Sequence, residues 1–178
     1  AFSKMGVQSY HRGYVLLAQI GKGSGMSYDW NAPGEDIAAL RHWFDTWGPL
    51  VNAADFVPAR ALFADNVTGF GTRMEIVAGL ENLEQNQWRQ VWPTIEGFVF
   101  LTEDMKIGVS PDRRMAMGLC GWNSTGFHED GTTFPRPGRA TVIFARDAFT
   151  SPWQGIHTHI SLNPGTPQVS HGERAVLS

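Results

Sequence analysis

The first regular pattern along the chain is helical. From Gly34 onward, apolar residues recur every three to four positions, at Ile37, Leu40, Phe44 and Trp47. This spacing places them on one face of a helix, and the preceding acids Glu35 and Asp36 suit the positive end of its dipole. We expect Gly48-Pro49 to kink or end this helix. Asp55 should cap a short second helix, so that the two form a helical hairpin.

A third helix is expected after two short strands at 67–70 and 74–78. Its apolar stripe is formed by Leu80, Leu83, Trp88, Val91 and Trp92. Pro93 should end it, because the residue before a proline disfavours helical geometry. Gln87 interrupts the apolar stripe, and a buried amide needs a hydrogen-bond partner, so Gln87 is a candidate ligand contact.

The second half of the chain has the character of strands. Long strands are expected at 98–109 and 115–128, and Glu129-Asp130-Gly131 then gives a hairpin signal. Further strands are expected at 140–146 and 154–162. Helices followed by a strand meander indicate an α+β fold.

The chain divides into three parts. Residues 1–33 show no sustained period and are expected to form an N-terminal extension, which could act as a lid. Residues 34–164 are of a size for one domain. Residues 165–178 are polar and contain Pro and Gly, so we expect a loose or partner-dependent C-terminal tail.

The amino-acid composition argues against several classes of binding partner. Apolar residues make up 42% of the chain, with seven Trp and eleven Phe, so an aromatic core is expected. The net charge of −3, with three lysines, argues against nucleic acid and against anionic membranes as partners. Cys120 is the only cysteine, so no internal disulfide can form. We therefore expect a soluble, cytoplasmic protein.

Candidate chemistry lies on the last strand. There His157, His159 and Ser161 share one face, and the opposite face carries Ile156, Thr158 and Ile160. The strand at 115–128 likewise places one set on a shared face, namely Cys120, Trp122 and Ser124. Periodicity alone does not decide which face points inward.

Several short motifs resemble one known family in their order and spacing. They lie at 51–56 (VNAADF), 61–67 (ALFADNV), 76–79 (IVAG), 126–131 (GFHEDG), 139–142 (RATV) and 153–161. Over roughly residues 35–164 the chain resembles the SnoaL-like and ketosteroid isomerase-like proteins of the nuclear transport factor 2-like superfamily. The resemblance implies a cone-shaped fold in which helices pack on a strongly curved mixed or antiparallel sheet and enclose an apolar cavity.

The same resemblance implies which residues face that cavity. It turns His157, His159 and Ser161 inward, together with Cys120, Trp122 and Ser124. It also places Trp47 where the isomerases carry a tyrosine that donates to the substrate oxygen. The positions of the two isomerase aspartates correspond to Gly71 and Val142, so steroid isomerisation by the two-aspartate route is not expected.

Two histidines beside each other suit acid–base chemistry, because imidazole exchanges protons near neutral pH. One would act as the base and the other would orient or donate, while Ser124 and Ser161 bind a substrate oxygen. Alternatively, the pair satisfies buried hydrogen bonds or lines a pocket that binds without reacting. A zinc site would need a third ligand such as His128, and no obvious one is supplied, so we expect neither a metal nor a cofactor.

Two functions remain in view. The first is a cofactor-free enzyme of the isomerase or lyase type that acts on a hydrophobic, aromatic or polycyclic small molecule, with His157 and His159 catalytic. Its substrate contacts would be Trp47, Gln87, Cys120, Trp122, Ser124 and Ser161. The second is a non-catalytic module for small-molecule binding or dimerisation. The family resemblance also implies a homodimer that pairs through the convex face of the sheet, with a trimer as the alternative.

Overall fold

The computed structural model describes Trp30 and residues 32–174. Most of the N-terminal extension expected over 1–33 therefore lies outside the described residues. Helix α2 (Gly34–Ala53) and helix α3 (Phe56–Arg60) form the expected hairpin. Pro49 neither ends nor interrupts α2, which continues to Ala53 and buries Val51 in the core. Asp55 precedes α3, but its side chain makes no capping hydrogen bond.

The expected third helix is present but irregular. It consists of α4 (Leu80–Leu83), the π-helix η1 (Glu84–Trp88), α5 (Arg89–Val91) and the 3₁₀ turn η2 (Trp92–Thr94). We refer to residues 80–94 as the wide helix, because the π-turn widens its middle. Single π-turns inside helices often occur at functional sites, since they change the direction of one side chain. No helix in the described part of the chain is long and apolar enough to cross a membrane.

The strands differ from expectation mainly at their ends. Their bounds are β1 (Phe63–Phe70), β2 (Val77–Ala78), β3 (Glu96–Phe100), β4 (Lys106–Val109), β5 (Met115–Phe127), β6 (Thr133–Pro135), β7 (Gly138–Ala145) and β8 (Gln154–Leu162). The strand expected at 98–109 is two strands, separated by the 3₁₀ turn η3 (Thr102–Asp104). Strand β6 was not expected, because its three residues contain a proline.

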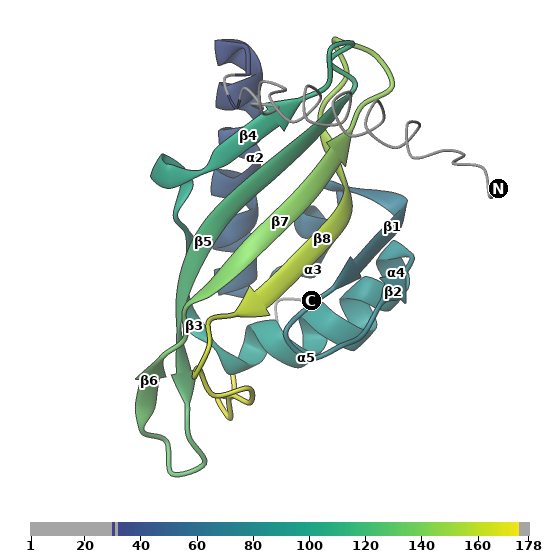
Figure 1. The fold of residues 1–178 in the computed structure, drawn as a ribbon. Coiled ribbons are helices and arrows are strands. Elements are labelled where there is room, and N and C mark those ends of the chain that lie inside the picture. Colours follow the sequence, from purple (N-terminus) through teal and green to yellow (C-terminus); the bar gives the residue numbers. More distant parts are fainter. Residues whose placement is uncertain (1–29, 31, 175–178) are drawn as a thin grey trace, which may run out of the picture.

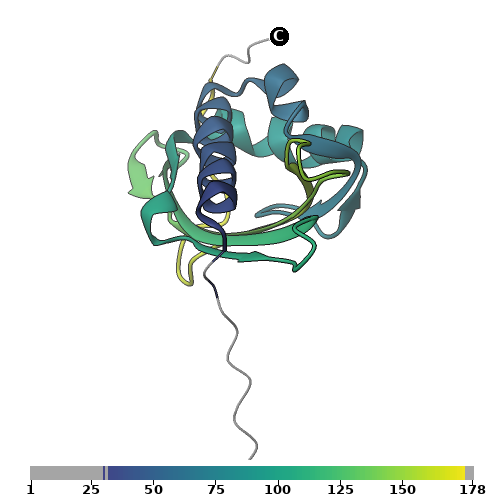
Figure 2. The same ribbon diagram turned by 90° about the horizontal axis from the view of Figure 1, so that it is seen from above.

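The sheet is mixed and strongly bent. Its order is β2-β1-β8-β7-β5-β3, and β4 and β6 also pair with β5. Strands β1 and β8 run parallel, whereas the other pairs are antiparallel. Helix α2 lies over the concave side of the sheet, and the wide helix closes one end (Figures 1 and 2). This arrangement confirms the predicted α+β fold with helices on a curved mixed sheet.

The inner face of β7 carries the clearest part of the core. Ala140, Val142 and Phe144 are buried there, and they alternate with more exposed residues. On β8 the alternation is broken by a bulge opposite Ile143 and Phe144. The residues that face inward are therefore Gly155 before the bulge and Thr158 after it.

The segment after β8 is not loose over the described residues. The Ser170 hydroxyl donates to the carbonyl of Thr94 and accepts from the backbone N–H of Phe127. Arg174 donates to the carbonyls of Asn52 and Trp92. Residues 163–174 thus bind the end of α2 and the wide helix to the β5–β6 hairpin, which corrects the expected loose tail.

Candidate functional site

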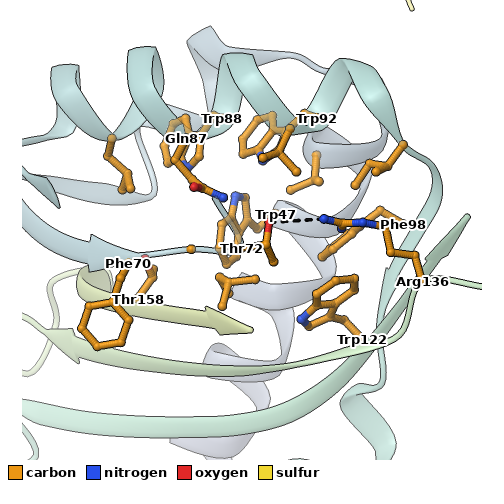
Figure 3. Close-up of a pocket in the computed structure, with 16 residues that line it drawn as sticks. Trp47, Phe70, Thr72, Gln87, Trp88, Trp92, Phe98, Trp122, Arg136 and Thr158 are labelled. Carbon is orange, nitrogen blue, oxygen red and sulfur yellow. Dashed lines mark hydrogen bonds between the residues drawn. The ribbon is translucent and has the colours of Figure 1, made fainter. Parts of the chain in front are cut away.

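A cavity lies on the concave side of the sheet, between α2, the wide helix and the inner faces of β5 and β8 (Figure 3). Its volume is about 40 Å³. Its lining is formed by Trp47, Val51, Phe70, Gly71, Thr72, Leu83, Gln87, Trp88, Val91, Trp92, Ile95, Phe98, Trp122, Arg136, Thr158 and Ile160. Most of these side chains are apolar, so the few polar groups among them determine what the cavity can recognise.

Aromatic pairs form the walls. Trp88 and Trp92 stack with their ring centroids 4.8 Å apart. Phe98 and Trp122 stack at 5.3 Å on the opposite side. Stacked rings contribute about 0.5 to 1.5 kcal/mol per pair beyond the area that they bury, so the walls have a defined geometry.

Arg136 is the charged group of the cavity. Its side chain is buried, with 2% of the residue exposed. Nη2 donates to Oγ1 of Thr72 over 3.3 Å, whereas Nε is buried and has no hydrogen-bond partner among the described residues. Burial lowers the pKa of Arg136 from 12.5 to about 10. The guanidinium therefore remains charged at neutral pH.

The backbone around Arg136 fixes its position. Pro135 and Pro137 flank it, and each proline ring restricts the backbone to a narrow range of φ. The N–H of Arg136 donates to the carbonyl of Ser124 over 2.7 Å, and the N–H of Ser124 donates back over 3.1 Å. Oγ of Ser124 also donates to the Arg136 carbonyl over 3.0 Å. Ser124, expected as a substrate contact, instead positions Arg136.

Gln87 extends from the π-turn toward Trp47 and Thr72 (Figure 3). Oε1 of Gln87 is buried without a hydrogen-bond partner among the described residues. The carboxamide occupies the space beside Gly71, where an added Cβ would lie 2.3 Å from it. Gly71 corresponds, by the family resemblance, to the position of the basic aspartate of the isomerases. In this chain it lines the cavity and leaves room for the carboxamide of Gln87.

Two indoles add further unpaired donors. Nε1 of Trp47 and Nε1 of Trp122 are buried, and neither has a hydrogen-bond partner in residues 30 and 32–174. A ligand with acceptor atoms would satisfy donors of this kind. Trp47, Gln87 and Trp122, three of the proposed substrate contacts, line the cavity.

Cys120 is half-buried on the inner face of β5 and packs against the core, but it is not among the lining residues. Burial raises the pKa of its thiol to about 12. A thiol with such a pKa remains protonated at neutral pH and is a poor nucleophile. The expected substrate contact is therefore not formed by Cys120 in this structure.

The expected inward orientation of His157, His159 and Ser161 is wrong. The residues of β8 that line the cavity are Thr158 and Ile160, and the histidines point to the opposite, convex face. The bulge in β8 sets this orientation, and it buries the methyl-bearing Thr158 while leaving the polar imidazoles near solvent. Neither His157 nor His159 is among the residues that line the cavity.

On the convex face the two histidines contact one aromatic ring. Phe70 meets His159 edge-on at 4.5 Å and His157 at 5.3 Å. The Thr68 hydroxyl lies 3.5 Å from Nδ1 of His157. Burial, and to a smaller extent the charge of His159, lowers the pKa of His157.

Sequence reasoning missed Arg136 and Thr72. A signal for Arg136 is present in the alternation of residues 134–144, where Phe134, Arg136, Val142 and Phe144 share one parity and are all buried. An arginine on an otherwise apolar strand face is a candidate for a buried functional charge. Thr72 follows the end of β1 and carries no comparable signal.

Comparison with known proteins identifies the fold through solved structures, whereas the sequence comparisons found no match. No protein-family model and no curated protein matches the chain by sequence. Among solved structures, a nuclear transport factor 2-like superfamily protein from Salmonella enterica is similar with a TM-score of 0.63 and 19% identity, over 76% of this chain and 96% of that protein. A ketosteroid isomerase-like protein from Erwinia carotovora has a TM-score of 0.59 and 17% identity, over 76% and 100%.

A third similar structure is a protein from Xanthomonas campestris described as a calcium/calmodulin-dependent protein kinase II association domain. Its TM-score is 0.59 at 20% identity, over 79% of this chain and 95% of that protein. Each of the three structures is similar to this chain over about three-quarters of its length. The chain therefore has the nuclear transport factor 2-like fold that its sequence motifs resemble.

Proposed function

We propose that the protein binds a small organic molecule in the cavity beside Trp47, Trp122 and Gln87. The supporting observation is an apolar cavity with a few buried polar atoms that lack partners among the described residues. This combination is typical of ligand sites, in which apolar walls supply affinity and a few polar groups fix orientation.

The volume favours a compact ligand. About 40 Å³ is open, whereas sites for drug-sized ligands measure roughly 300 to 1,000 Å³ and an apolar cavity of about 150 Å³ binds benzene. A molecule with one ring would therefore require a small movement of the walls. A polycyclic molecule would require a large one, so we propose a ligand of one ring or less.

Binding without chemistry is the function that the cavity supports best. The described lining residues include no carboxylate, imidazole, thiol, amine or phenol. The groups that normally act as a general base at neutral pH are thus absent from this part of the wall. The alternative is an acid–base enzyme of the isomerase or lyase type, which is favoured by the likeness to the ketosteroid isomerase-like structure.

Toluene is a suitable first probe because it is small and neutral. Its binding can be followed by NMR of the tryptophan indole N–H groups, and we expect the signals of Trp47 and Trp122 to shift. Val51→Phe should abolish the shifts, since Val51 is buried in the cavity wall. The matched control is Val57→Phe, because Val57 is 70% exposed on α3. An absence of shifts in the wild type at millimolar toluene would contradict the proposal.

The catalytic alternative is tested on the histidines. The double variant His157→Gln/His159→Gln should leave toluene binding unchanged, because the pair lies on the face opposite the cavity. Loss of turnover of an identified substrate in this variant, with retained binding, would instead favour the enzyme.

We also propose that the protein forms a homodimer through the convex face of its sheet and that it is cytoplasmic. The association-domain structure supports the plausibility of oligomers in this fold. The location is a prediction from the single cysteine, and cell fractionation would test it.

A further inference from the structure

We propose that the ligand of this cavity is a carboxylate and that Arg136 is its counterion. The inference rests on the proposed binding function and names the chemical class that the site would accept. The supporting observation is that the guanidinium of Arg136 is buried and that no carboxylate of the described residues pairs with it.

The charge of Arg136 is the only buried one that the described residues leave unpaired. Three charged residues are buried in residues 30 and 32–174, and two of them are acids. Asp36 pairs with Arg113 and Arg146. Glu84 pairs with Arg60 and Arg89. No carboxylate of the described residues forms an ion pair with Arg136, and burial is the only cause that shifts its pKa.

The existing contacts of Arg136 do not compensate for its burial. Its single side-chain hydrogen bond, to Thr72, is long at 3.3 Å. The Trp122 ring lies 5.8 Å from the guanidinium carbon, near the outer limit of about 6 Å for a cation–π interaction. A buried charge is normally paired, because the transfer of an isolated charge out of water is very unfavourable. A bound anion would supply the missing partner.

The neighbouring groups specify a carboxylate. Thr72 accepts from Nη2 and retains its own hydroxyl proton to donate. The indole N–H groups of Trp47 and Trp122 are two more unpaired donors in the same lining. A planar carboxylate matches the fork of a guanidinium, and one negative charge balances one arginine. A phosphate dianion would leave excess charge beside apolar walls.

The position of Arg136 also suggests how the ligand is oriented. Arg136, Thr72 and Val91 line both the inner cavity and a second, outer hollow of about 130 Å³. The outer hollow includes Arg73 and residues 168–170, so it is more polar. The carboxylate would therefore lie at Arg136, at the junction of the two hollows, with the apolar part of the ligand directed toward Trp88 and Leu83.

The test compares benzoate with benzamide, which has nearly the same shape but no charge, by titration calorimetry of the full chain. We expect benzoate to bind wild type at least about 10-fold more tightly than benzamide. Arg136→Gln should weaken benzoate binding on the order of 30-fold or more, because it removes one partner of a buried charge pair. Arg139→Gln is the matched control, since Arg139 follows three residues later in the chain and is exposed on β7.

Each outcome has a defined meaning. Equal affinity for benzoate and benzamide, or an unchanged preference in Arg136→Gln, would overturn the carboxylate inference while toluene binding still supports the proposed function. Stronger binding of sulfate than of benzoate would also overturn it. If toluene, benzoate and benzamide all fail to bind, the result would contradict both the proposed binding function and the carboxylate inference.

A stability measurement separates ligand recognition from a structural role. If Arg136 is retained for a ligand, Arg136→Met should leave the Tm of the ligand-free protein unchanged or raise it, since an unpaired buried charge is lost. The same variant should lose the rise in Tm that benzoate gives the wild type. A marked fall in Tm without ligand would mean that Arg136 is structural and would overturn the inference.

Discussion

At two glycines in the cavity region, a side chain could be added only if neighbouring atoms shifted. The two positions differ in how easily those atoms can move. A Cβ at Gly71 would meet the Gln87 carboxamide, the end of a flexible side chain. A Cβ at Gly138 would lie 2.3 Å from the carbonyl oxygen of Ser161 and 2.1 Å from Trp122. The backbone of a sheet cannot shift as easily as the side-chain carboxamide of Gln87.

We therefore expect Gly71→Ala to lower the free energy of unfolding by less than about 1 kcal/mol, partly offset by reduced freedom of the unfolded chain. Gly138→Ala should cost roughly 2 to 3 kcal/mol through overpacking. Urea denaturation measures both. In a Gln87→Ala background the cost of Gly71→Ala should vanish, and an unchanged cost there would contradict the proposed contact.

The histidine pair predicts a pH effect. Burial lowers the pKa of His157 most, and the charge of His159 lowers it further. NMR titration should give His157 a midpoint below the ordinary value of about 6.5. His159→Gln should raise that midpoint only in part, because burial remains. A midpoint at or above the ordinary value would contradict this account.

The same pKa fixes the sign of the stability change. A lowered pKa means that the folded protein binds the proton less readily than the unfolded chain. The contribution of His157 to stability is therefore complete above about pH 6.5 and decreases as the pH falls toward the pKa of the folded state. His157→Gln should remove this part of the acid-induced loss of stability.

At the scale of elements, Asp36 ties three of them together. It lies in the first turn of α2, and its carboxylate accepts from Arg113 over 2.6 Å and from Arg146 over 3.1 Å. Arg113 belongs to the turn between β4 and β5, and Arg146 follows β7. The ion pair thus attaches the start of the helix to the β4–β5 turn and to the end of β7.

Asp36→Asn should therefore lower the free energy of unfolding by about 3 to 5 kcal/mol, because two arginines lose a buried counterion. The neighbouring Glu35→Gln is the control. Glu35 also pairs with Arg113, at 2.5 Å, but its side chain is 66% exposed, so the expected cost is below about 1 kcal/mol. Similar losses for the two variants in thermal or chemical denaturation would contradict the role given to Asp36.

Elements differed in how well the sequence predicted them. Helix α2, strand β5 and strand β8 were confirmed, because each is a long element bounded by turn or loop residues. The split between β3 and β4 and the π-turn in the wide helix were not predicted. A π-turn inserts one residue into a helical pattern, and its stability comes from the tertiary contacts of the side chains that it redirects.

At the scale of the whole molecule, the convex face of the sheet is the surface proposed for dimerisation. Half-buried apolar side chains on it include Met117 and Ile143, which pair across β5 and β7. Light scattering at micromolar concentration should give the mass of a dimer. Ile143→Glu should convert it to a monomer, whereas Val57→Glu, at an exposed position on α3, should not. A monomeric wild type would contradict the proposed homodimer.

The sequence by itself determined the fold class and the order of the main elements. Gln87 was proposed as a ligand contact because a polar residue in an apolar helix stripe needs a specific environment, whereas Trp47 and Trp122 were proposed from the family resemblance. The motifs also indicated that Gly71 replaces a carboxylate. These are local properties, or properties of order along the chain, and a single sequence contains them.

Only the tertiary structure decided which face of β8 points inward and where the charge of the cavity lies. Strand alternation is symmetrical between the two faces, and one bulge reverses it. His157 and His159 therefore lie outside while Thr158 lies inside. The role of Arg136 can be recognised only when the residues that surround it in space are known. Whether an acid lies close enough to pair with Arg136 depends on the tertiary structure and not on its neighbours in the sequence.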